Sequence, residues 1–169
     1  MTGVPRNGEN ERAMTIKLSA AIWAGVAAGI LSSVVEVLLW VVLTDQFPAA
    51  LFRDVRLTAA MVMGPRALPP PIGFNLWYMA VATLIHFALS VIYGLAVAAL
   101  VTGRGPRTAL LMGALFGAAL YGINLYGFTL IFPWFVQARD WVTLTAHLAF
   151  GITAAGTYRY LALTARRDE

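Results

Sequence analysis

Long apolar segments dominate the chain, and the most continuous of them is residues 77–101. This run of 25 residues contains no Asp, Glu, Lys or Arg and only one histidine, His86. At about 1.5 Å rise per residue, a helix of this length crosses a bilayer core of ~30 Å. Three further runs, residues 18–44, 109–132 and 141–163, are nearly as apolar. The pattern predicts an all-α integral membrane protein built as a bundle of four transmembrane helices within residues 16–163.

The segment between the first two predicted spans, residues 45–76, is too polar to lie in the membrane. It contains charged residues, a Gly-Pro-Arg turn and three consecutive prolines, all of which are costly in lipid. Apolar residues recur in it with helical spacing at Leu51, Val55, Ala59 and Val62. We therefore expect a short helix lying on the membrane surface, with Arg53 and Arg56 turned away from it, followed by a stiff extended connector.

The basic residues predict the orientation of the bundle. With four spans, both termini and the 102–107 turn share one side of the membrane. Eight Lys and Arg residues fall on that side and four on the other. Because cytoplasmic loops carry the excess of Lys and Arg, both termini are expected in the cytoplasm, with a mobile tail at residues 1–15 and a short tail at 164–169.

The composition agrees with a membrane protein and excludes several classes of function. Only 12% of the residues are charged and the mean hydropathy is +0.74, whereas soluble domains carry ~25% charged residues. The absence of cysteine excludes disulfides, thiolate-ligated metals and a thiol nucleophile. The net charge of +4 comes mostly from the edges of apolar runs, so the lipid bilayer is the expected partner and nucleic acid is not. We expect no enzyme activity and no catalytic residue, since no phosphate-binding loop, GxSxG or HExxH motif is present.

A weak internal repeat relates the two halves of the chain. The echoed positions are Gly25 and Gly29 with Gly113 and Gly117, and His86 with His147. The pattern favours two helix pairs of parallel sense, as a duplication produces. These glycines, together with Gly151, give three of the four helices a face of small residues, which lets helices approach closely in lipid. We expect the faces to pack within the bundle, and the alternative is that one of them binds another subunit.

One polar residue in each predicted span lies at a similar depth. The four are Glu36, His86, Asn124 and His147. Counted from the same ends of their helices, they lie roughly 10–15 Å deep at about 1.5 Å per residue. A charged group near the bilayer centre costs about 2.5–3.5 kcal/mol, and such residues usually face the bundle interior. Glu36 is therefore expected to be neutral or paired with a protonated histidine.

Three interpretations of this layer remain open. The favoured one is a buried hydrogen-bonded cluster that fixes which helix faces which. In the second, Glu36 with His86 and His147 passes protons or binds a small cation. In the third, the two histidines ligate a haem iron, or bind a metal together with Glu36. The absence of an HxxxH or ExxH pair on any single helix counts against the third.

The stretch from Ile85 to Tyr160 also resembles a known family. The resembling features are Ile85-His86-Phe87 with Ser90, Leu111-Met112-Gly113-Ala114-Leu115, Phe132-Pro133-Trp134, and Ala146-His147-Leu148 followed by Tyr158-Arg159. In these motifs the chain resembles the YagU-like small inner-membrane proteins of bacteria. The resemblance implies the bacterial cytoplasmic (inner) membrane, with residues 45–76 in the periplasm, and it supplies no catalytic residues.

The small size, the small-residue faces and the absence of a catalytic set favour a non-catalytic role. We expect an accessory or structural subunit, or a stabiliser, of a larger membrane complex such as a respiratory one. The first alternative is a small oligomeric transporter or channel component whose path is lined by Glu36, His86 and His147. The second alternative is a haem- or metal-binding membrane protein.

Overall fold

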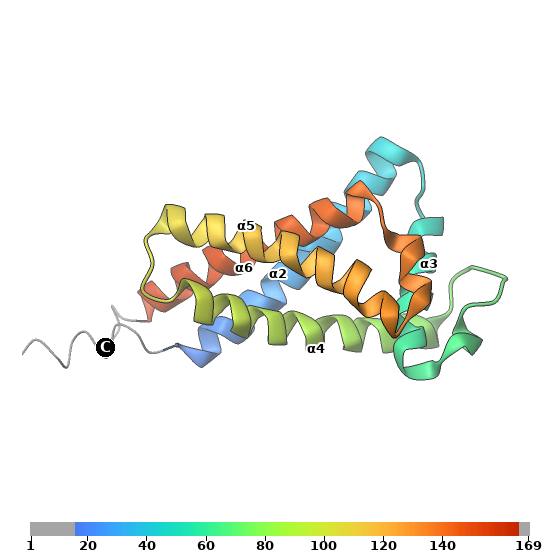
Figure 1. The fold of residues 1–169 in the computed structure, drawn as a ribbon, viewed down its shortest axis with the longest axis horizontal. Helices are drawn as coiled ribbons and strands as arrows, with labels where there is room; N and C mark the ends of the chain where they lie inside the picture. Colours follow the sequence, from blue (N-terminus) through green and yellow to red (C-terminus); the bar gives the residue numbers. More distant parts are fainter. Residues whose placement is uncertain (1–15, 166–169) are drawn as a thin grey trace, which may run out of the picture.

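The computed structural model describes residues 16–165, and every regular element within them is helical. Four long helices run lengthwise through the molecule, as Figure 1 shows. They are α2 (Leu18–Leu39), α4 (Leu76–Val101), α5 (Pro106–Gly122) and α6 (Trp141–Thr164). The predicted all-α class is confirmed. The expected tails at residues 1–15 and 166–169 lie outside the described residues.

Three helical stretches are long and apolar enough to cross a bilayer: Leu18–Thr44, Leu76–Val101 and Pro106–Leu130. They expose large apolar side chains on the outside of the bundle, and Leu84 and Leu115 are 72% and 61% exposed. Exposure of this kind is unfavourable in water and normal in lipid. The chain is therefore a membrane protein. Helix α6 has 24 residues, but its threonines, histidine and arginine make it less apolar than the other three.

Two of the long helices continue into widened turns. Helix α2 passes into a π-helix over Trp40–Thr44, and α5 into a π-helix over Ile123–Gly127 that carries Asn124. The first predicted span, residues 18–44, thus matches α2 and its π-helix together. The third begins three residues before the predicted start, because Pro106 occupies the first helical turn, where its missing N–H costs nothing.

Closely packed glycines join α2 to α4. A Cβ atom added to Gly94 of α4 would lie only 2.6 Å from the Cα of Gly25 on α2. One added to Gly29 would lie 2.6 Å from Ser90 Oγ and 3.2 Å from His86 Nε2. The two backbones approach this closely only because side chains are missing at the contact.

Helices α5 and α6 meet in the same manner. A Cβ atom on Gly113 would lie 2.8 Å from Ala155 Cβ, and one on Gly117 or Gly151 would meet the backbone of the facing helix. In both pairs a GxxxG face packs on a helix that carries a histidine, with Gly29 beside His86 and Gly117 beside His147. The internal repeat of the sequence therefore has a counterpart in the packing. The predicted placement of the glycine faces inside the bundle agrees with these contacts.

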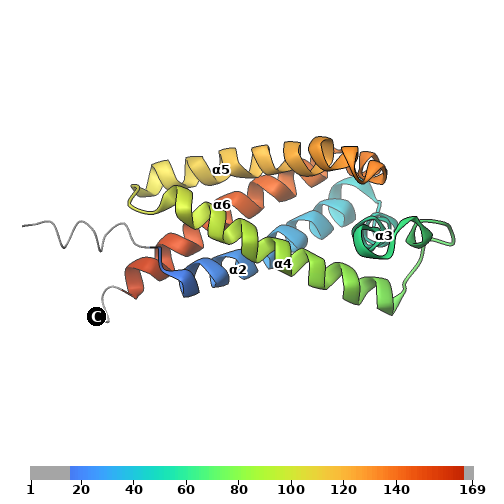
Figure 2. The same ribbon diagram turned by 60° about the horizontal axis from the view of Figure 1, so that its bottom comes forward.

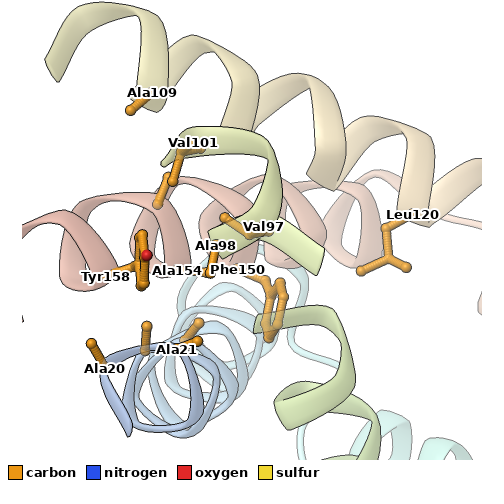
Figure 3. Packing of buried hydrophobic residues seen from close by; sticks show 13 residues of the cluster. Ala20, Ala21, Val97, Ala98, Val101, Ala109, Leu120, Phe150, Ala154 and Tyr158 are labelled. Atoms are coloured by element: carbon orange, nitrogen blue, oxygen red, sulfur yellow. The ribbon is translucent and has the colours of Figure 1, made fainter. Parts of the chain in front are cut away.

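The main core lies toward the end of the bundle where α2 begins and α6 ends. It consists mostly of alanine and valine around Tyr158, which is 2% exposed (Figure 3). The Tyr158 hydroxyl lies 2.8 Å from Thr102 Oγ1 and accepts a hydrogen bond from the Lys17 backbone N–H. Arg159 also donates to the carbonyl of Arg104. These contacts hold the start of α2, the α4–α5 turn and the end of α6 together at one end.

A short helix, α3 (Ala49–Met63), lies across the opposite end (Figure 2). A helix in this segment was predicted, with Leu51, Val55, Ala59 and Val62 facing the membrane surface. Of these, Ala59 is fully buried within the protein and Val62 is 75% exposed, whereas Ala50 and Leu57, outside that stripe, are 4% and 3% exposed. Asp54 is half-buried beside Arg53, which balances its charge. Helix α3 therefore packs against the ends of the long helices.

Arg56 of α3 holds the proline-rich connector between α3 and α4. Its Nη1 donates to the carbonyls of Ala67 at 3.0 Å and Pro69 at 2.7 Å, and its Nη2 donates to Pro71 O at 2.7 Å. Its guanidinium also lies 5.0 Å from the centre of the Tyr78 ring. Arg53 and Arg56, which were predicted to turn away from the apolar stripe, both have polar partners within the protein.

Candidate functional site

A cavity of about 220 Å³ lies between the α2–α4 pair and the α5–α6 pair, and α3 closes part of it. The structure brings all four residues of the predicted polar layer to its wall: Glu36, His86, Asn124 and His147. Each comes from a different long helix or its π extension, as their similar depth in the sequence indicated. Convergence of polar groups in a concave site is the usual arrangement for binding a small molecule.

A chain of hydrogen bonds crosses the cavity wall from α4 to α6. The Tyr93 hydroxyl donates to Asn124 Oδ1 at 3.2 Å, and Asn124 Nδ2 lies 3.3 Å from His147 Nε2. His147 Nδ1 lies 2.8 Å from the carbonyl of Thr143. Because a carbonyl can only accept, the His147 proton sits on Nδ1, and Nε2 accepts from the Asn124 amide. Both ring nitrogens are therefore engaged.

Glu36 is bonded to a threonine and not to a histidine. Thr143 Oγ1 donates to Glu36 Oε1 at 3.3 Å. Within the described residues, the second carboxyl oxygen of Glu36 receives no hydrogen bond. Glu36 was expected to be neutral or paired with a protonated histidine, and the structure does not show the pairing. Thr143 instead connects the two predicted residues, since its hydroxyl bonds Glu36 and its carbonyl bonds His147.

The hydrogen bonds of His86 stay within the α2–α4 pair. Its Nε2 lies 3.2 Å from the Gly29 carbonyl and 3.4 Å from Ser33 Oγ. The carbonyl requires a donor, so this nitrogen carries the proton. Among residues 16–165, no three His, Cys, Asp or Glu side chains are placed to hold a metal ion. The donor set therefore does not fit the metal interpretation, and the engaged nitrogens of His147 do not fit axial haem ligation.

Helix α3 adds a charged group to the cavity that the sequence analysis missed. Asp54 lines the cavity, and Arg53 Nε donates to its Oδ1 at 2.6 Å. Burial raises the pKa of Asp54, and its hydrogen bond and charge interaction with Arg53 oppose that rise. Arg53 Nη2 also lies 3.7 Å from Asp140 Oδ2 at the start of α6. This ion-pair cluster joins α3 to the helix that holds Thr143.

Asp140 also caps the start of α6, so its removal should lower the free energy of unfolding. Its Oδ1 accepts from the Thr143 backbone N–H at 2.8 Å and so caps α6. We expect Asp140→Ala to lower the free energy of unfolding by about 0.5–2 kcal/mol. Asp140→Asn keeps the capping oxygen and is expected to recover most of the loss. Thermal unfolding in detergent, followed by circular dichroism, measures both variants, and equal destabilisation by the two would contradict the capping role.

A scan with protein-family models, a search of curated proteins and a search of solved structures found no match to this chain. The resemblance to the YagU-like proteins therefore stays a prediction from short motifs.

Proposed function

We propose that the chain is a small transporter or channel component that carries a small polar solute through the cavity between its two helix pairs. In this proposal all four long helices cross the membrane, α6 included. The start of α2 and the end of α6 face the cytoplasm and α3 faces the periplasm of a bacterium, in the inner membrane.

The end of the bundle that gathers around Tyr158 supports the proposed topology. Lys17, Arg104, Arg107 and Arg159 all belong to the segments that meet there. Basic residues near the ends of spans favour the cytoplasmic side. An even number of crossings also agrees with the start of α2 and the end of α6 lying together, as Figure 1 shows.

The observation that carries the function is a polar cavity inside an otherwise apolar bundle. Ionisable groups within membrane helices are costly, and they commonly mark a substrate or ion pathway. The glycine contacts join α2 to α4 and α5 to α6 and do not involve Glu36, which lies in the cavity wall. The cavity therefore favours the transporter over the accessory subunit that the sequence alone favoured. The glycine faces that supported a partner subunit are occupied within the bundle.

Blocking the cavity tests the proposal. Ser33 lines the cavity, whereas the next residue, Val34, is 46% exposed on the outside. Liposomes containing the purified protein are loaded with a mixture of small metabolites, and release of each compound is followed by mass spectrometry. We expect wild type and Val34→Phe to release a subset of compounds rapidly. Ser33→Phe is expected to reduce that release to the rate of protein-free liposomes.

Equal release by the two phenylalanine variants would contradict transport through the cavity. The accessory-subunit alternative has its own observation, which is the recovery of a larger membrane complex in fixed stoichiometry with the tagged protein in mild detergent. Recovery of that complex together with no cavity-dependent release would replace the transporter proposal with the accessory one.

A further inference from the structure

The charges around the cavity are unbalanced. Two carboxyl groups, Glu36 and Asp54, line it, and no Lys or Arg of the described residues does. Asp54 has Arg53 as a close partner at 2.6 Å. Among residues 16–165, Glu36 accepts a hydrogen bond only from the neutral hydroxyl of Thr143. Arg53 also attracts it, but that cation is already bonded to Asp54. A negative charge on Glu36 therefore needs a positive charge inside the cavity.

The same cavity is rich in aromatic rings. Tyr93, Phe128, Phe135 and Phe150 contribute to its wall. Tyr93 and Phe150 meet edge to face, with their ring centres 6.3 Å apart, so they cannot stack flat on each other. Ring faces attract cations electrostatically, and the attraction grows when water is excluded. An aromatic wall in the same cavity as Glu36, the carboxyl group without a bonded cation, fits an organic cation better than a strongly hydrated metal ion.

We infer that the solute is a small organic cation of the quaternary ammonium type, bound between Glu36 and the aromatic wall in exchange for a proton. The inference rests on the proposed transport function and names its substrate class. The Tyr93–Asn124–His147 chain would then form the neutral polar side of the same site.

The exchange follows from charge balance. In the empty site the Glu36 carboxyl group keeps its proton, because an uncompensated charge in an apolar bundle is costly. When the cation enters, the O–H bond of Glu36 breaks, the proton leaves to water, and the carboxylate pairs with the cation. When the cation leaves, a proton returns. The other titratable or charged groups around Glu36 are His86 on α4, His147 on α6, Arg53 and Asp54 on α3, and Asp140 before α6.

Binding of choline to the purified full chain in detergent tests the inference. The comparison compound is 3,3-dimethyl-1-butanol, which has the same shape with carbon in place of the charged nitrogen. We expect choline to bind and to release a proton into weakly buffered solution, and the uncharged compound to bind at least about tenfold more weakly. Glu36→Gln should abolish the proton release and weaken choline binding to a similar degree.

The matched control is Asp45→Asn, which removes an exposed acid directly after the helical stretch that carries Glu36. It should leave choline binding and proton release unchanged. The choline affinity of wild type should also rise with pH, since protons compete for the same carboxyl group. This wild-type measurement keeps the inference testable even where Glu36→Gln does not fold.

Four results would overturn the inference. Equal binding of choline and its uncharged counterpart, or choline binding by wild type without proton release, would exclude the cation-for-proton exchange but leave the proposed transport function standing. If choline fails to bind but neutral or anionic metabolites are released and Ser33→Phe blocks that release, the exchange is again excluded and the transport function stands. Failure of choline to bind, together with no release sensitive to Ser33→Phe, would overturn both proposals.

Discussion

Gly151→Ala is expected to destabilise the bundle by about 1–3 kcal/mol, although alanine is normally the better helix former. A Cβ atom at this position would lie 2.9 Å from the carbonyl carbon of Gly113 and 2.9 Å from the backbone nitrogen of Gly117. Both are main-chain atoms, which cannot change rotamer to make room. Helices α5 and α6 must therefore move apart along their whole seam, and the cavity wall formed by Asn124 and His147 moves with them.

The control for this substitution lies further along the same helix. At Gly156 the nearest atom to an added Cβ is Leu110 Cδ2 at 3.6 Å, an ordinary contact with a flexible side chain. Gly156→Ala is expected to be neutral or to stabilise by up to ~1 kcal/mol. Thermal unfolding of both variants in the same detergent measures the difference. Loss of stability of equal size at the two glycines would show that the close approach of α5 and α6 is not the cause.

Arg56→Ala is expected to release the connector between α3 and α4. The side chain supplies hydrogen bonds to three carbonyls of that connector, at 2.7 to 3.0 Å. A single hydrogen bond to a charged group contributes about 1.5–3 kcal/mol, so losing all three should exceed the effect of an ordinary surface change. We expect rapid proteolytic cleavage within residues 64–75, measured by mass spectrometry of the fragments, while the long helices stay intact.

Two further variants isolate the geometry of this contact. Arg56→Lys keeps the charge but has one ammonium group in place of the forked guanidinium, so it should protect the connector only in part. Arg66→Ala removes an exposed arginine from the connector itself and should leave cleavage unchanged. Protection by Arg56→Lys equal to that of wild type would mean that charge alone holds the segment.

The long helices and the convergence of the polar residues were predictable because lipid imposes strong rules. A helix must be long and apolar to cross a bilayer, and a polar group within it needs a hydrogen-bonding or charged partner. Counting residues from the helix ends was therefore enough to relate Glu36 to His86, Asn124 and His147. The bounds of α4 and α6 differ from the predicted ones by a single residue each.

The partners within the site were not predictable, because they depend on how each helix is rotated. Glu36 bonds Thr143, one of several threonines on α6, and nothing in the spacing singles it out except the capping residue Asp140 three positions earlier. The contacts of α3 within the protein were not predictable for a different reason. Hydrophobic periodicity placed Leu51, Val55, Ala59 and Val62 on one face, and of these only Ala59 is buried within the protein. Burial of Asp54 depends on Arg53, and hydrophobic periodicity does not register such a pair.

The central position of α6 has a consequence for how the protein is made. It is the least apolar of the long helices and packs most extensively on α2 and α5 (Figure 2). Its Thr143 bonds Glu36 of α2, and its His147 bonds Asn124 of the π-helix that follows α5. It is also the last of the four to leave the ribosome. Alone in the bilayer, this helix would present His147 and Thr143 to lipid without partners. In the proposed topology its insertion therefore depends on three earlier helices that have already assembled. Those helices supply the polar partners that lipid cannot offer to the final span.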